Sequence, residues 1–161
     1  MADYREAFVG MDVAKLKNAV AVAESGRDGE VRYFGEVDAS DASMRRIIQR
    51  IAAKFDYVHF CYEAGPTGYG LYRLIQSLGH KCMVVAPSLI PRKPGDRVKT
   101  NRRDAVALAR LLRAGELTAV WVPDEGHEAM GDLIRARAAA VETLRVHRQQ
   151  VSAFMLKHSR I

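Results

Sequence analysis

The stretch Ser40 to Glu63, S-D-A-S-M-R-R-I-I-Q-R-I-A-A-K-F-D-Y-V-H-F-C-Y-E, decides the predicted fold because it places a helix directly before a strand. Ser40 is a typical N-cap residue. It is followed by apolar residues at helical spacing, namely Met44, Ile47, Ile48, Ile51 and Phe55. Tyr57 to Glu63 is then apolar enough for a strand. A strand reached through a helix is typically parallel to an earlier strand, so this stretch predicts an α/β fold.

Three short apolar runs precede this stretch and predict three strands, at Ala7–Ala14, Ala19–Ala23 and Val31–Val37. The last two runs are separated by residues typical of a hairpin turn, Gly26, Asp28 and Gly29. The short connections predict an antiparallel meander at the start of the chain.

The alternation of helix and strand continues after Glu63. Apolar spacing predicts a helix from Tyr69 to Leu78 and a strand from Lys81 to Val85. A further helix should begin near Thr100 or Asn101, either of which can act as N-cap, and should end at Gly115. Leu117–Val122 is either a short final strand or an extended return. The pattern predicts a mixed five-stranded sheet flanked by helices.

The residues from about Glu125 onwards predict one long helix, because they contain no proline and carry apolar residues at intervals of three, four and seven. A helix of ~30 residues would be about 45 Å long. We interpret residues 1–124 as one domain and residues 125–161 as the start of a helical arm that mediates oligomerisation. We expect the sequence to be the N-terminal part of a longer protein.

Composition narrows the class of protein. The chain has 161 residues, of which 48% are hydrophobic, and it has no apolar run long enough to span a membrane. Its N-terminus lacks the apolar core of a signal peptide. Cys61 and Cys82 are too few for a disulfide framework or a zinc site, so both are expected to be reduced thiols. These features predict a cytoplasmic protein, and a pI near 9.5 predicts polyanionic partners.

The basic charge is concentrated in one segment, Arg92 to Arg113. It has two acidic residues and eight basic ones, so its net charge of +6 equals that of the whole chain. Local basicity of this kind is typical of a nucleic-acid contact. The alternative is a solvated basic loop without a partner. The segment carries the four residues predicted to hold phosphates, Arg97, Lys99, Arg102 and Arg103.

Single acidic residues occupy the places where a sheet of this type binds ligands. Asp12 lies in the first predicted strand, Glu63 ends the fourth and Asp104 begins the late helix. Ligands gather beyond the carboxyl ends of parallel strands. Carboxylates there can hold Mg²⁺, and two such ions can promote phosphodiester displacement. The alternative is that the acids have structural roles: Asp12 pairs with a strand neighbour, Glu63 caps the next helix with Thr67, and Asp104 offsets nearby arginines. Spacing alone does not decide between the two interpretations.

Three motifs, taken in order, resemble one protein family. They are G-M-D-V-A-K at Gly10–Lys15, Y-E-A-G-P-T-G-Y-G-L at Tyr62–Leu71 and V-K-T-N-R-R-D-A at Val98–Ala105. They resemble the DEDD-type insertion-sequence transposases, a family that includes Piv-like DNA invertases and bridge-RNA-guided recombinases. The stretches Leu108–Leu117 and Trp121–Glu125 are similar to the same family.

The resemblance implies a ribonuclease-H-like fold, as in Holliday-junction resolvases. It implies that Asp12, Glu63 and Asp104 bind Mg²⁺ or Mn²⁺. The fourth family acid falls on Asn101, whose amide can offer an oxygen but carries no charge. Either Asn101 is a weaker ligand or the site works with three acids, and the catalytic set would be Asp12, Glu63, Asn101 and Asp104. The family also has a C-terminal domain with a serine nucleophile, which we expect to be absent from these 161 residues.

We therefore expect the nuclease-like domain of a DNA transposase or recombinase, with DNA and a structured guide RNA as partners. It would act in Mg²⁺-dependent strand cleavage and exchange, and this stretch alone would be inactive in transposition. One alternative is an ATP-binding domain of the actin and sugar-kinase type. Another is a metal-free module for nucleic-acid binding or dimerisation.

Overall fold

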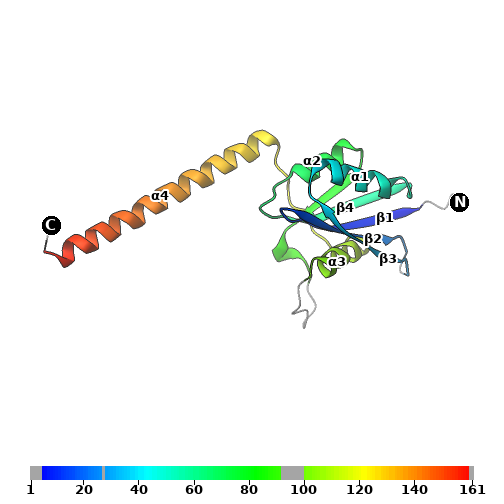
Figure 1. Cartoon of the computed structure of the whole chain (residues 1–161), viewed down its shortest axis with the longest axis horizontal. Coiled ribbons are helices and arrows are strands. Elements are labelled where there is room, and N and C mark those ends of the chain that lie inside the picture. The colour runs from blue at the N-terminus through cyan, green and yellow to red at the C-terminus, as the bar shows by residue number, and fades with distance from the viewer. Residues whose placement is uncertain (1–4, 27, 92–99, 160–161) are drawn as a thin grey trace. The chain divides into compact units, whose positions relative to one another are not determined.

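A five-stranded sheet in the order β3-β2-β1-β4-β5 organises the first part of the chain (Figure 1). The computed structural model describes residues 5–26, 28–91 and 100–159. Its elements are β1 (Glu6–Asp12), β2 (Lys17–Glu24), β3 (Val31–Asp38), α1 (Asp41–Ala52), β4 (Tyr57–Glu63), α2 (Gly70–Ser77), β5 (Lys81–Val85), the short 3₁₀ helix η1 (Pro87–Leu89), α3 (Asn101–Ala114) and α4 (Glu125–Lys157). The chain divides into two compact units, Met1–Trp121 and Val122–Ile161.

The strand pairing confirms the predicted mixed sheet. β1 pairs with β2 and β2 with β3 in antiparallel fashion, which is the predicted meander. β4 returns through α1 to lie parallel to β1, and β5 returns through α2 to lie parallel to β4. β4 and β5 have the predicted bounds. The carboxyl ends of β1, β4 and β5 therefore lie along one edge of the sheet.

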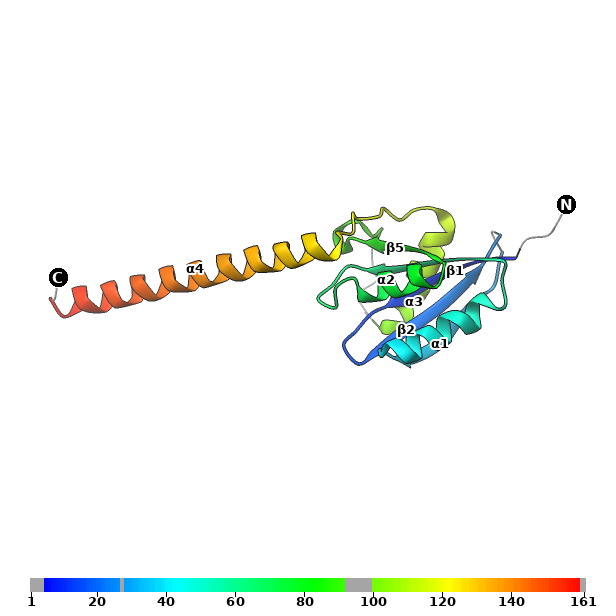
Figure 2. The ribbon, with the colours of Figure 1, turned by 90° about the horizontal axis from the view of Figure 1, so that it is seen from above.

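Helices cover both faces of the sheet. Alternate residues of β2, which are Ala19, Ala21 and Ala23, pack with Ala105 and Ala109 of α3. Asn18 lies on the opposite face, where its Nδ2 contacts Met44 Sδ of α1 at 3.3 Å. Figures 1 and 2 show α1 and α2 on one side of the sheet and α3 on the other. The sheet is thus the middle of three layers.

The contact between β1 and α3 is close enough to exclude a side chain. A Cβ atom added to Gly10 would lie 2.3 Å from the carbonyl oxygen of Ala105 and 2.4 Å from the amide nitrogen of Ala109. Backbone therefore rests on backbone, with alanines on either side. This contact fixes how near α3 lies to the centre of the sheet.

The ends of α3 follow the predicted signals. Thr100 is the N-cap, and its Oγ1 accepts a hydrogen bond from the Arg103 amide at 3.2 Å. Gly115 ends the helix in the left-handed conformation with φ of 70°. The expected cap of α1 is only half correct. Ser40 occupies the N-cap position without a side-chain capping bond, and its own amide donates to Asp38 Oδ1.

Leu117–Val122 is an extended return, joined to the sheet by a single bridge between Val85 and Ala119. Trp121, near the end of that return, is 74% exposed. Both cysteines are free, as predicted, and burial raises the pKa of each thiol.

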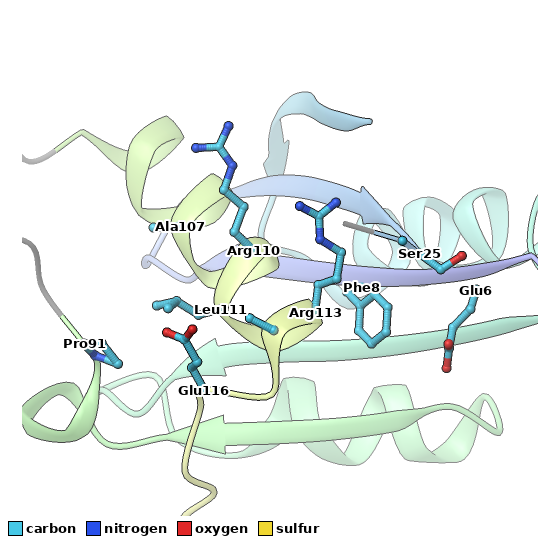
Figure 3. Close-up of a pocket in the computed structure, with 11 residues that line it drawn as sticks. Glu6, Phe8, Ser25, Pro91, Ala107, Arg110, Leu111, Arg113 and Glu116 are labelled. Atoms are coloured by element: carbon cyan, nitrogen blue, oxygen red, sulfur yellow. The ribbon is translucent and has the colours of Figure 1, made fainter. Parts of the chain in front are cut away.

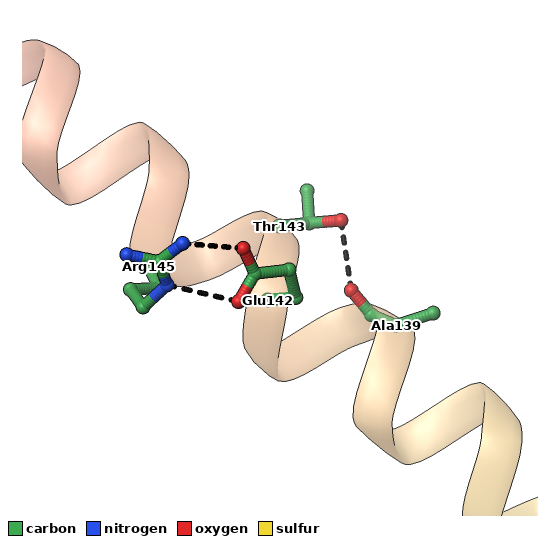
Figure 4. A network of polar contacts seen from close by, with 4 residues as sticks. All are labelled: Ala139, Glu142, Thr143 and Arg145. Carbon is green, nitrogen blue, oxygen red and sulfur yellow. Dashed lines mark hydrogen bonds and ion pairs between the residues drawn. The ribbon is translucent and has the colours of Figure 1, made fainter.

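The second unit contains α4, a helix of 33 residues that begins where the long helix was predicted. All of these residues are described, and none is buried. Contacts along its surface are local: Glu142 pairs with Arg145, and Thr143 Oγ1 donates to the Ala139 carbonyl at 2.8 Å (Figure 4). Within the described part of the chain, no helix has the length and apolar character that crossing a membrane requires.

Replacing Gly10 tests the contact between β1 and α3. Gly10→Ala should lower the free energy of unfolding by about 1–3 kcal/mol, because the new methyl group overpacks against helix backbone. Denaturant-induced unfolding followed by circular dichroism measures this loss. Gly70→Ala is the matched control, since no atom lies within 4 Å of a Cβ added there. Equal stability of the two variants would contradict the close packing of α3 on β1.

Candidate metal and nucleic-acid site

Asp12 and Glu63 occupy neighbouring positions at the ends of two parallel strands. Met11 of β1 pairs with Tyr62 of β4, and each acid is the next and last residue of its strand. Adjacent strands are about 4.8 Å apart, so the two carboxylates lie side by side at the carboxyl edge of the sheet. The predicted convergence of these two acids is therefore supported by the strand register.

Both side chains belong to the face that α3 covers. Gly10, two residues before Asp12, contacts the backbone of α3. Cys61, two residues before Glu63, places its Sγ 3.7 Å from the Leu108 carbonyl oxygen of α3. Residues two apart in a strand share a face. Asp104 is half-buried in the first turn of α3, directly before the Ala105 that touches Gly10.

A further acid on this face was not identified from the sequence. Asp12 pairs with Ala19 of β2, and Ala19 pairs with Glu36 of β3, so Glu36 lies on the α3 face in the same row. The register of β2 and β3 shifts between Val20 and Ala21, which leaves Phe34 as an extra residue. Simple alternation along β3 therefore fails to predict the face of Glu36. The one local sequence signal of this extra residue is Gly35, a glycine inside the strand, which adopts a positive φ of 100°.

Asn101 and Arg102 connect the start of α3 to β3. Asn101 Nδ2 donates to Glu36 Oε1 at 3.2 Å. The Arg102 guanidinium lies over the Tyr33 ring, 5.3 Å from its centroid. Partial burial raises the pKa of the Tyr33 hydroxyl, and the Glu36 and Asp12 carboxylates raise it further against the effect of Arg102. These groups therefore share one electrostatic environment.

The donor set suits a hydrated divalent cation. In the described ranges, no three histidine, cysteine, aspartate or glutamate side chains gather closely enough to form a metal cage. Mg²⁺ seldom needs one, because it keeps several waters and is usually held by one or two carboxylates and substrate phosphates. The adjacent carboxylates of Asp12 and Glu63 fit that requirement. Asp104 lies on the facing helix, in the first turn of α3.

The start of α3 also suits a phosphate. Its first turn carries the exposed side chains of Arg102 and Arg103. Helix N-termini favour anions through the helix dipole and unpaired backbone amides. Arg97 and Lys99, the other two residues predicted to hold phosphates, lie outside the described residues.

A cavity of about 900 Å³ lies near the C-terminal end of α3, and Asp12, Glu63 and Asp104 do not line it (Figure 3). It borders Glu6 and Phe8, at the start of β1, whereas Asp12 is at its end. Arg113 lines it and has a structural role, because its Nη1 donates to the carbonyl oxygens of Glu24 and Gly29 at 3.1 and 2.8 Å. Part of the basic segment thus anchors α3 to the β2–β3 hairpin.

Comparison with known proteins gives consistent matches. Residues 9–159 match the family model of DEDD transposases of the IS110 type, described as transposase. The chain is 83% identical over its whole length to y4qE of Sinorhizobium fredii (strain NBRC 101917 / NGR234), which carries a provisional transposase name. It is 36% identical over 154 residues, or 95% of its length, to the transposase for insertion sequence element IS1533 of Leptospira borgpetersenii. The chain spans 41% and 44% of these two relatives.

A solved structure identifies the fold. The RuvC structure of Thermus thermophilus superposes with a TM-score of 0.50 at 10% sequence identity. The match covers 71% of this chain and 99% of RuvC. The ribonuclease-H-like fold predicted from the sequence is therefore confirmed.

Proposed function

Because this chain belongs to the DEDD transposases of the IS110 type, we propose that residues 1–124 form a nuclease-like domain for DNA strand cleavage and exchange in transposition of an insertion sequence. The neighbouring positions of Asp12 and Glu63, directly after the paired Met11 and Tyr62, carry the proposal, since both acids belong to the family motifs. The family match favours this function over the ATP-binding alternative.

Each group in the proposed site has a distinct task. Asp12 and Glu63, with Asp104 from the facing helix, would hold a divalent cation, Mg²⁺ or Mn²⁺. Such an ion, when bound, supplies Lewis-acid stabilisation to a phosphodiester displacement. Arg102 and Arg103 would hold the phosphate backbone and orient it over the carboxylates. The overall +6 charge draws polyanions towards the protein.

Strand transfer itself would need more than this stretch. Both curated relatives are more than twice as long as the chain. We propose that these 161 residues bind the cation and DNA, with a structured guide RNA as a further partner. A separate C-terminal serine domain would provide the nucleophile, so this stretch alone would not complete transposition.

Asp12→Asn tests the cation site. The amide removes one of two adjacent negative charges, so Mn²⁺ binding measured by isothermal titration calorimetry should fall by at least about tenfold. The fold should be retained, as judged by circular dichroism. Asp28→Asn makes the same chemical change in the β2–β3 turn and should leave binding intact. Unchanged binding by Asp12→Asn, with DNA affinity retained, would favour the metal-free binding module.

Arg102→Gln with Arg103→Gln tests the phosphate contact. Losing two phosphate contacts should weaken DNA binding and reduce the slope of log K against log salt concentration by about 2. Fluorescence anisotropy over a salt series measures both quantities. The control, Arg45→Gln with Arg46→Gln, removes equal charge from α1 on the opposite face of the sheet. Identical salt slopes for the two double variants would place the DNA elsewhere.

We also propose that α4 associates with α4 of a second copy. It exposes apolar side chains at spacings of three, four and seven, including Val141, Leu144, Val151 and Met155, which are 39–61% exposed. Such a stripe is typical of helices that pack along a seam. Arg137 and Arg148 interrupt it, which favours a weak contact over a long continuous coiled coil.

Leu144→Glu should abolish this self-association, because it places a charge in the middle of the apolar stripe. Analytical ultracentrifugation over a concentration series measures the loss. Ala153→Glu is the control, since residue 153 lies nine residues further on, two and a half turns, and so faces the other side of the helix. A concentration-independent monomer in the unmodified chain would contradict the proposed association.

A further inference from the structure

Asn101 occupies the position of the fourth acid of the family. Its hydrogen-bond partner is Glu36, the acid that was not identified from the sequence. The bond from Asn101 Nδ2 to Glu36 Oε1 joins the first turn of α3 to β3. Glu36, Ala19 and Asp12 are successive neighbours across three strands. The small side chain of Ala19 separates the two acids. Asn101 therefore belongs to a helix turn placed over the row that contains both carboxylates.

The chemistry of this hydrogen bond orients the amide. An ionised carboxylate can only accept hydrogen bonds, whereas an amide donates through nitrogen and accepts through oxygen. Glu36 therefore selects the orientation in which Asn101 presents its NH₂ group to β3. The carbonyl oxygen Oδ1 takes no part in this bond, so it is the atom left for another ligand.

Glu36 also explains why an amide suits position 101 here. An aspartate in the same place would set a second carboxylate about 3 Å from Glu36, and like charges so close disfavour ionisation of one of them. Asparagine turns that repulsion into a hydrogen bond. Where the family has a negative charge at position 101, this chain has one on Glu36 of β3.

We infer that Glu36 is a positioning residue, which holds the Asn101 amide so that Oδ1 serves the proposed cation site as a neutral oxygen ligand; this rests on the proposed function. Direct coordination by Glu36 is disfavoured, because β3 lies three strands away from β4, which carries Glu63. Two strand spacings place its backbone roughly 9.6 Å from that of Asp12. Partners that orient a metal ligand commonly change metal affinity by about 10–100-fold when they are removed.

Mn²⁺ titration by calorimetry on the 161-residue chain tests the inference. Glu36→Ala should weaken binding roughly tenfold, the lower end for orienting partners, since the bond is exposed. Glu36→Gln should retain most of the affinity, because its carbonyl oxygen still accepts from Asn101. Asn101→Ala should match Glu36→Ala, and the double variant should be no weaker than either single one. The melting temperature without metal should remain unchanged in all of them.

In a protein that already carries Asn101→Asp, Glu36→Gln should change Mn²⁺ affinity in the opposite direction. With aspartate at position 101, Glu36→Gln should strengthen Mn²⁺ binding by removing the repulsion between the two carboxylates. Glu30→Ala is the matched control, because it removes an exposed carboxylate just before β3 that pairs with Arg32. It should leave Mn²⁺ affinity unchanged in both backgrounds.

Three outcomes would overturn the inference. Equal weakening by Glu36→Gln and Glu36→Ala, with additive loss in the double variant, would make Glu36 a ligand itself. Unchanged affinity in Glu36→Ala, with binding still lost in Asp12→Asn, would refute the role of Glu36 and leave the proposed cation site standing. Absence of Mn²⁺ binding in the unmodified chain would refute both.

Discussion

The backbone contact between Gly10 and α3 is the constraint on which the site depends. Because backbone atoms of α3 contact Gly10 directly, the distance between the helix and the sheet is fixed. The alanines of β2 and α3 fill the space beside this contact. Asp104 and Asn101 lie within the turn that precedes Ala105, so the contact at Gly10 determines how far they lie from the sheet. A larger residue at position 10 would lift the helix and carry these two groups away from Asp12. Packing and chemistry are therefore coupled through a residue that has no side chain.

The carboxyl edge of the sheet concentrates charge that the fold alone does not need. Like charges placed side by side on neighbouring strands are unfavourable, and Asp12 and Glu63 are such a pair. Features that break a local rule of stability are expected at functional sites. Arginines in the first turn of α3 add positive charge to the same region. With acids at the edge of the sheet and arginines in the first turn of α3, this region suits a cation and a phosphate bound together.

Much of the fold was predictable from local pattern. The bounds of β4 and β5, the cap at Thr100 and the left-handed Gly115 are encoded by residues close to one another in the chain. Glu36 was missed because its face depends on an extra residue in β3, and pairing register is a non-local property. The same applies to Arg113, whose carbonyl partners are more than 80 residues away. The cation-binding and catalytic roles of Asp12, Glu63, Asn101 and Asp104 stay predictions that rest on the family motifs.

Diffraction from a crystal of the protein grown with Mn²⁺ and DNA tests the central claim most directly. The anomalous signal of manganese locates the ion independently of any assumption about its ligands. We expect a peak in direct coordination with Asp12 and Glu63, with a phosphate oxygen between the ion and the first turn of α3. A peak remote from both carboxylates, or DNA bound away from this edge of the sheet, would contradict the proposed site.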